Sequence, residues 1–119
     1  MQLEDYFEFE KFDTKFGPVE RIRIKGHRIS IEHVLDFYKQ GMSPDVIQRD
    51  HYSSLTLEEV YATITYYLHN KERVDVYLKH GEEVAEAYYQ EYLALEPSPV
   101  VERLRNMAAQ RQETVQGER

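Results

Sequence analysis

The chain has 119 residues, enough for one domain with a single hydrophobic core, since a domain of this length buries about two thirds of its unfolded surface on folding. It contains no cysteine, which excludes disulfides, thiolate metal ligands and a cysteine nucleophile. The net charge is -7, with 22 acidic against 15 basic residues, so the surface as a whole has the wrong sign for binding phosphates.

A soluble cytoplasmic protein with no membrane partner is expected. No apolar run approaches the roughly 18–20 residues that cross a bilayer. Residues 1–10 are acidic, whereas a signal peptide begins with basic residues. The absence of cysteine also fits a reducing compartment.

The first predicted element is a β-hairpin within residues 6–29. Polar and apolar side chains alternate there with a period of two, which is typical of strands with one covered face. Gly17-Pro18 interrupts the alternation, and the second run, ERIRIKGHRI, is locally basic in an acidic chain. The last turn is expected at Lys25-Gly26, since glycine readily adopts the positive φ of a tight turn.

Three helices are predicted next, over residues 31–40, 44–50 and 57–69. Gly41 is placed to end the first of them in a left-handed cap, and Pro44 occupies the first position of the second. The helices begin at residues that can accept hydrogen bonds from free N–H groups: Ser30, Ser43 and, in a capping box, Thr56 with Glu59. The close spacing of the last two helices predicts a helix-turn-helix.

The 57–69 helix is expected to have one apolar face and one polar face. Its inward positions are Leu57, Val60, Tyr61, Ile64, Tyr67 and Leu68. Its outward positions are Glu58, Glu59, Ala62, Thr63, Thr65, Tyr66 and His69.

A long helix is predicted over residues 71–95. Apolar residues recur there at spacings of three and four, close to the a and d positions of a coiled coil. Gly81 lies in this stripe and weakens the helix by about 1 kcal/mol relative to alanine. Because about six turns exceed what the three preceding helices can cover, the stripe predicts a homodimer contact through Val74, Tyr77, Val84, Tyr88, Tyr92 and Leu95.

The segment EPSPVV is expected to end this helix, since two prolines two residues apart cannot both lie inside one. Apolar residues after Ser98 indicate a last short amphipathic helix, followed by a frayed polar tail, QRQETVQGER. The chain is therefore predicted to be mainly α, with one helix-turn-helix domain over residues 1–95 and a C-terminal extension over 96–119.

The sequence contains no motif of an enzyme. Its five glycines are isolated, which excludes the familiar phosphate-binding loops. Three histidines have an acidic residue one helical turn away, but two ligands do not hold a metal, and surface hydrogen bonds explain the pairs better. The serines near His51 are better explained as helix caps than as nucleophiles. We expect no catalytic residue, cofactor or metal.

The chain resembles a bacterial family described as domain of unknown function 433, especially a form common in cyanobacteria that begins with a segment similar to LEDYF. The markers are KGHRI at 25–29, GMSPDVI at 41–47, SLTLEEVYATITYYL at 54–68 and HNKE at 69–72. The resemblance implies a homeodomain-like or winged helix-turn-helix fold. It also implies an antitoxin or transcriptional autoregulator, since some members neutralise PIN-like nuclease toxins encoded beside them.

In a first hypothesis, the 57–69 helix reads operator DNA in the major groove. The acidic pair at its start repels phosphate, so binding is expected to be weak or to depend on a partner. The candidate backbone contacts are Arg21, Arg23, Lys25, His27 and Arg28, and the candidate groove contacts are Thr63 and Tyr66.

In the alternative hypothesis, the helix-turn-helix is purely structural and the chain is a protein-interaction module. An acidic surface then covers a basic partner such as the substrate groove of a nuclease, and residues 100–108 add an apolar anchor. The acidic residues are Glu82, Glu83, Glu86 and Glu91.

Overall fold

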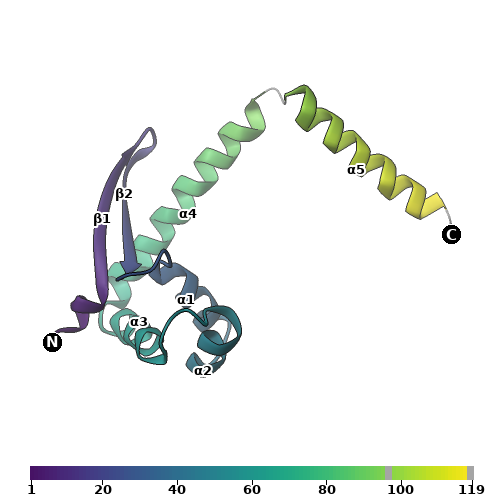
Figure 1. Ribbon diagram of the computed structural model, residues 1–119. Helices are drawn as coiled ribbons and strands as arrows, with labels where there is room; N and C mark the ends of the chain where they lie inside the picture. Colours follow the sequence, from purple (N-terminus) through teal and green to yellow (C-terminus); the bar gives the residue numbers. More distant parts are fainter. Residues whose placement is uncertain (96–97, 118–119) are drawn as a thin grey trace. The chain divides into compact units, whose positions relative to one another are not determined.

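The computed structural model describes the backbone of residues 1–95 and 98–117, and the side chains of residues 1–95 and 98–111. The described part is mainly helical and carries an N-terminal two-stranded antiparallel hairpin, as the sequence predicts (Figure 1). The chain divides into two units, Met1–Glu86 and Ala87–Arg119. Among the described residues, no helix is both long enough and apolar enough to cross a membrane.

The hairpin follows the short 3-10 helix η1 (Leu3–Tyr6) and consists of β1 (Phe7–Thr14) and β2 (Gly17–Ile24). The expectation that Gly17-Pro18 lies between the strands is wrong, because both residues belong to β2. The Thr14 hydroxyl accepts from the Phe16 N–H at 3.2 Å and donates to the Gly17 carbonyl at 2.6 Å, which closes the turn earlier. A proline is tolerated in β2 because each strand of a two-stranded sheet has an unpaired edge.

The turn at Lys25-Gly26 is confirmed. Gly26 has a φ of +83°, and the His27 N–H donates to the Ile24 carbonyl at 3.0 Å. The strands therefore end before this turn, and residues 25–29 form a loop rather than the end of the hairpin.

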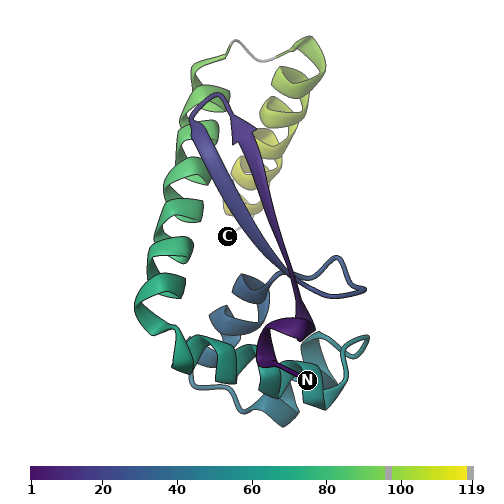
Figure 2. The same ribbon diagram turned by 90° about the vertical axis from the view of Figure 1, so that its left-hand side faces the viewer.

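The predicted helices are present as α1 (Ile31–Lys39), α2 (Pro44–Val46) with η2 (Ile47–His51), and α3 (Leu57–His69). Gly41 has a φ of +91°, as its predicted role at the end of α1 requires. Figure 2 shows the three helices gathered at one end of the hairpin.

The second helix differs from the prediction because it widens into a π-helical turn over η2. The Tyr52 N–H donates to the carbonyl of Ile47, five residues earlier, at 3.0 Å. The widened turn accompanies two ring contacts with Phe37: His51 stacks at 4.0 Å between centroids, and Tyr52 lies edge-on at 5.9 Å. Phe37 belongs to α1, so the contacts that accompany the π-helical turn involve a residue outside the local sequence. The sequence of residues 44–51 therefore does not indicate this turn.

The predicted N-caps stand at the helix starts. The capping box before α3 is confirmed, since the Thr56 N–H donates to Glu59 Oε1 at 2.8 Å and the Glu59 N–H donates to Thr56 Oγ1 at 3.1 Å. Ser43 Oγ accepts from the Val46 N–H at 3.4 Å. Ser30 precedes α1, and its N–H donates to His33 Nδ1 at 3.1 Å.

The core of the first unit lies between the hairpin and the helices, with α1 against α3 and η1 against α3. Its fully buried side chains are mostly aliphatic and come from each of these layers: Ile22, Ile24, Ile31, Val34, Leu35, Ile47, Val60 and Val74. The hairpin lies along the first turns of α4 (Lys71–Ala94) in both views (Figures 1 and 2).

Side chains of α4 cover the outer edge of β2. The Ile22 N–H donates to the Tyr77 hydroxyl at 3.1 Å, and the Pro18 carbonyl lies 2.8 Å from His80 Nε2. An uncovered edge presents unpaired backbone groups that favour association with other chains. The packing against α4 removes this liability from β2.

The last helix is longer than predicted. α5 (Pro99–Gly117) continues through most of the segment expected to be a frayed tail. The segment is rich in glutamine, arginine and glutamate, which are good helix formers, and this propensity outweighs its lack of an apolar face. Residues 96–97 and 118–119, which the predicted break and tail include, lie outside the described residues.

Candidate functional site

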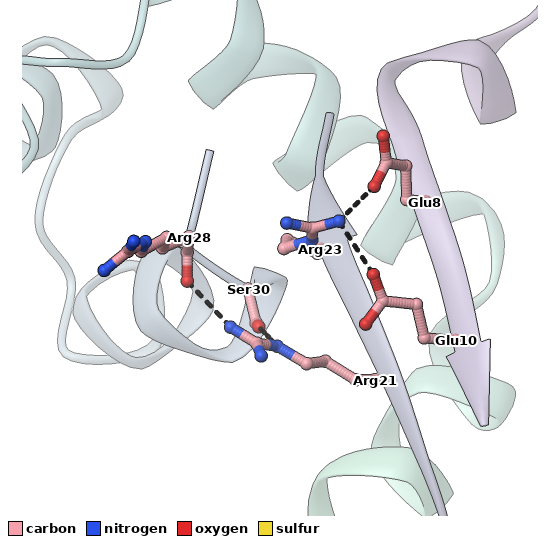
Figure 3. Close-up of polar contacts among 6 residues, drawn as sticks. All are labelled: Glu8, Glu10, Arg21, Arg23, Arg28 and Ser30. Carbon is pink, nitrogen blue, oxygen red and sulfur yellow. Dashed lines mark hydrogen bonds and ion pairs between the residues drawn. The ribbon is translucent and has the colours of Figure 1, made fainter. Parts of the chain in front are cut away.

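Arg23, in the predicted DNA-contact cluster, is bound by carboxylates of β1. Its Nη2 donates to Glu8 and, at 2.8 Å, to Glu10 Oε1 (Figure 3). The antiparallel register makes this possible, since Glu8 pairs with Arg23 across the hairpin. The charge of Arg23 is therefore neutralised within the chain rather than offered to a phosphate.

Arg21 is hydrogen-bonded to the segment that follows the hairpin. Its Nε donates to the Ser30 hydroxyl and its Nη2 to the Arg28 carbonyl, each at 2.9 Å (Figure 3). These bonds join β2 to the start of α1. We assign Arg21 and Arg23 mainly structural roles.

The loop over residues 25–29 lies beside the start of α3. His27 Nε2 is 3.0 Å from Glu59 Oε2, and both side chains are largely covered. The structure thus brings the basic loop and the helix start together. Lys25 and Arg28 are exposed on this loop, and neither side chain has an ion-pair partner among the described residues.

The predicted outward face of α3 is wrong at Thr63 and Tyr66, which are 0% and 3% exposed. The Thr63 hydroxyl donates to the Glu59 carbonyl at 2.8 Å, and the Tyr66 hydroxyl accepts from Arg73 Nη1 at 3.0 Å. The Tyr66 ring lies 5.1 Å from that of Phe7 between centroids. Burial raises the pKa of Tyr66. Neither side chain is available to read a DNA groove.

These residues are buried because the N-terminal segment covers a second side of α3: η1 packs against the helix, and Phe7 and Phe9 of β1 contact Tyr66. Ala62, also predicted to face outward, is 6% exposed. The aromatic residues of β1 and the many apolar residues of α3 were the available signal, since a helix that is apolar on most sides is usually buried on most sides.

The surface that α3 does expose includes three large apolar side chains. Leu57, Tyr61 and Leu68 are 39%, 48% and 55% exposed, although the sequence predicted them to face the core. At 100° per residue they fall within one narrow stripe, which Thr65 borders. α3 contains no lysine or arginine. We call Leu57, Tyr61 and Leu68 the α3 patch.

The acidic residues at the start of α3 are also engaged. Glu58 accepts a hydrogen bond from the Tyr6 hydroxyl, and this bond raises the pKa of Tyr6. Glu59 completes the capping box and contacts His27. Carboxylates near a helix N-terminus are stabilised by its dipole. The same charges oppose phosphate binding at this end of α3.

The histidine–acid pairs do not assemble into metal centres. No group of three or more histidine and acidic side chains that would hold a metal occurs in residues 1–95 and 98–111. His33 instead accepts from the Ser30 N–H, and His80 lies next to the Pro18 carbonyl.

The comparisons with known proteins reach part of the chain. Residues 21–67 match the family model described as "Protein of unknown function (DUF433)". This range runs from β2 through most of α3, so it contains the basic loop and the α3 patch except Leu68. No curated protein and no solved structure matches the chain.

Proposed function

We propose that this chain is a non-enzymatic, antitoxin-type regulator that binds a partner protein through the α3 patch. Its α1, α2 with η2, and α3 form a homeodomain-like or winged helix-turn-helix scaffold. The capped helix starts and the packing of α1 on α3 support that arrangement. The resemblance to the family named above supports a PIN-like nuclease as the partner.

The observation that carries the proposal is the chemistry of the exposed side of α3. A helix that reads DNA places hydrogen-bond donors such as arginine, lysine or asparagine against base edges. The exposed residues of α3 are two leucines, a tyrosine, a glutamate, a threonine and a histidine, with no arginine, lysine or asparagine. Exposed aromatic and aliphatic residues grouped on one face are characteristic of protein contacts.

The acidic residues of α4 fit the same kind of partner. Glu83 is exposed, and Glu86 follows on the same helix. A protein that binds a nuclease over its nucleic-acid surface meets lysine and arginine there, and complementary charge increases the rate of association. The net charge of -7 then favours binding instead of opposing it.

The test is co-expression with the product of the neighbouring gene. If that product is a nuclease toxin, the unchanged chain should restore growth and co-purify with it. Tyr61→Ser combined with Leu68→Ser should abolish both the rescue of growth and the co-purification, because the two substitutions remove the apolar centre of the α3 patch. Thr65→Ser on the same exposed side is the matched control. Full neutralisation by the double variant would contradict the proposal.

A second candidate function, weak DNA binding, is favoured by one observation. The contact between His27 and Glu59 places Lys25 and Arg28 beside the start of α3, where they can reach phosphates. Two phosphate contacts predict a slope of about -2 for the logarithm of affinity against the logarithm of salt concentration for each protomer.

Fluorescence anisotropy with the chain's own upstream DNA at low salt measures this slope, for the chain alone and with its partner. Lys25→Ala combined with Arg28→Ala should remove the signal, whereas Lys11→Ala, an exposed cation on β1, should not. The absence of any salt-dependent binding in either condition would exclude DNA as a ligand.

A further inference from the structure

The first unit contains a groove bounded by β2, α1 and α4, with a volume of about 660 Å³. Its walls are mostly apolar and come from the hairpin, from α1 and from α4. The main apolar lining residues are Phe12, Val19, Phe37, Tyr52, Tyr77 and Leu78. The hydrophobic groove is large enough to receive several side chains of a helix.

The charged groups of the groove have an acidic excess, with four carboxylates against one arginine and one lysine. Glu20 binds Arg73 at 2.6 Å, and Glu32 accepts from the Tyr77 hydroxyl at 2.7 Å. Lys39 is bound to Asp75 at 3.1 Å, and Arg21 to the loop.

Two acidic residues of the groove are available to bind a ligand. Asp36 and Glu82, on α1 and α4, have no hydrogen-bond or ion-pair partner through their side chains among the described residues. A ligand with basic residues beside an apolar surface would complement these two carboxylates.

Gly81 lines the groove from the middle of α4. A glycine inside a helix is destabilising. Packing within the chain does not require it, since a Cβ added there would meet no atom within 4 Å. A glycine at such a position allows the backbone of another segment to approach closely.

α5 carries the features that would complement the groove. Val100, Leu104 and Met107 are each more than half exposed and lie on one side of the helix. Arg103 borders this stripe, and Arg111 lies on the same side of the helix one turn beyond Met107. The described side chains of α5 include three arginines, counting Arg105, against Glu102.

We propose that α5 of one copy docks in the groove of a second copy, and that the exchange is reciprocal. The apolar stripe then covers the groove walls, Arg103 and Arg111 face Asp36 and Glu82 of the second copy, and the absence of a side chain at Gly81 lets the helix approach closely. A two-fold dimer with two identical contacts results. It differs from the predicted coiled-coil contact through α4, because half of that stripe is used within the chain.

The mass of the full chain in solution is the first test. Multi-angle light scattering should give twice 14.3 kDa. Leu104→Asp should weaken dimerisation by about 100-fold, since it places a charge at the centre of the contact. Asn106→Asp adds the same charge on the opposite side of α5 and should leave the dimer intact. A monomeric unchanged chain, or a dimer insensitive to Leu104→Asp, would overturn the proposal.

A mixing experiment tests the groove separately. Asp36→Arg combined with Glu82→Arg blocks the groove but leaves α5 intact, whereas Leu104→Asp disables α5 but leaves the groove intact. Each variant alone should be monomeric and should retain the circular dichroism of the unchanged chain. Their mixture should form a heterodimer through the one remaining contact. A mixture that stays monomeric would show that α5 and the groove do not bind each other.

Cysteine cross-linking distinguishes a second copy from other occupants, and the chain has no native cysteine to interfere. A variant with Ala85→Cys and Ala108→Cys should form a covalent dimer on mild oxidation. An intrachain disulfide in a monomer would mean that α5 occupies its own groove, which overturns the proposal. Cosedimentation of α5-intact monomer with anionic phosphatidylserine vesicles, without any dimer, would assign the basic helix to a membrane surface and would also overturn it.

Discussion

The two halves of α4 carry the same stripe of apolar residues but have opposite environments. In the first half, Val74 is fully buried and Tyr77 packs against the core; Val84, just past the midpoint, is 9% exposed. In the second half, Tyr92 is more than half exposed, as is Leu95 directly after the helix. Tyr88, the remaining stripe residue, is also exposed. The predicted continuous dimer stripe therefore divides into a buried part and an exposed part.

The difference shows that periodicity identifies an apolar face without identifying what covers it. The hairpin, which lies far from α4 in the sequence, covers the first half through contacts such as that between Ile22 and Tyr77. The stripe residues after Val84 remain exposed. A homodimer remains our proposal, with α5 and the groove as its contact.

The largest difference in stability should come from placing a charged side chain in each half of α4 in turn. Val74→Asp should destabilise the chain by about 3–5 kcal/mol, since an uncompensated carboxylate would lie in the core. Tyr92→Asp should change the stability of the monomer by no more than about 0.5 kcal/mol, as at most exposed sites. Urea unfolding followed by circular dichroism measures both. Equal effects would contradict the division of α4.

A smaller contrast should come from single hydroxyl groups. Tyr77→Phe removes the group that donates to Glu32 and accepts from the Ile22 N–H, which leaves that buried N–H without a partner. The expected loss is about 1–3 kcal/mol in the free energy of unfolding. Tyr92→Phe is the matched control, with an expected change near zero. An undiminished melting temperature for Tyr77→Phe would show that the hydroxyl is dispensable for β2.

The buried tyrosines should also make the first unit sensitive to alkali. Burial, and then the hydrogen bond to Glu32, raises the pKa of Tyr77, and burial raises the pKa of Tyr66. The unfolded chain therefore releases these protons first, near pH 10, so stability is retained below about pH 10 and falls above it. Each tyrosine contributes at most about 1.4 kcal/mol per pH unit.

Urea titrations between about pH 8 and pH 11 measure this slope. In the Tyr77→Phe variant, the free energy of unfolding should fall less steeply with pH than in the unchanged chain. In the Tyr92→Phe variant, it should fall more steeply than in Tyr77→Phe. A slope that is the same in both variants would mean that Tyr77 ionises equally easily in the folded and unfolded chain.

The smallest effect has the opposite sign. Gly81→Ala should stabilise the folded monomer by about 0.5–1 kcal/mol, because alanine is the better helix former and its Cβ meets no atom within 4 Å. At the same time it should weaken the dimer, where the proposed contact approaches this position. Thermal unfolding at low concentration and light scattering at high concentration separate the two effects. A dimer strengthened by Gly81→Ala would argue against close approach at Gly81.

The elements of the fold could be predicted from short-range chemistry, and the candidate site could be predicted only in part. Thr56 and Glu59 bond across three residues, so the start of α3 is evident in the sequence. The predicted DNA contacts follow from charge and periodicity alone. The structure leaves Lys25 and Arg28 exposed, commits Arg21 and Arg23 to other groups, and buries Thr63 and Tyr66.

The local amino-acid sequence thus specifies where the helices begin and end and where Gly26 and Gly41 turn the backbone. The capping and turn hydrogen bonds that decide these positions join residues only a few positions apart. The packing of distant segments specifies which faces of those helices remain for a partner. Phe7 reaches Tyr66, and Glu8 and Glu10 take up the charge of Arg23, only after the hairpin has folded against α3. The burial of a side chain depends on residues that are distant in the sequence, and the apolar pattern of one helix does not identify those residues.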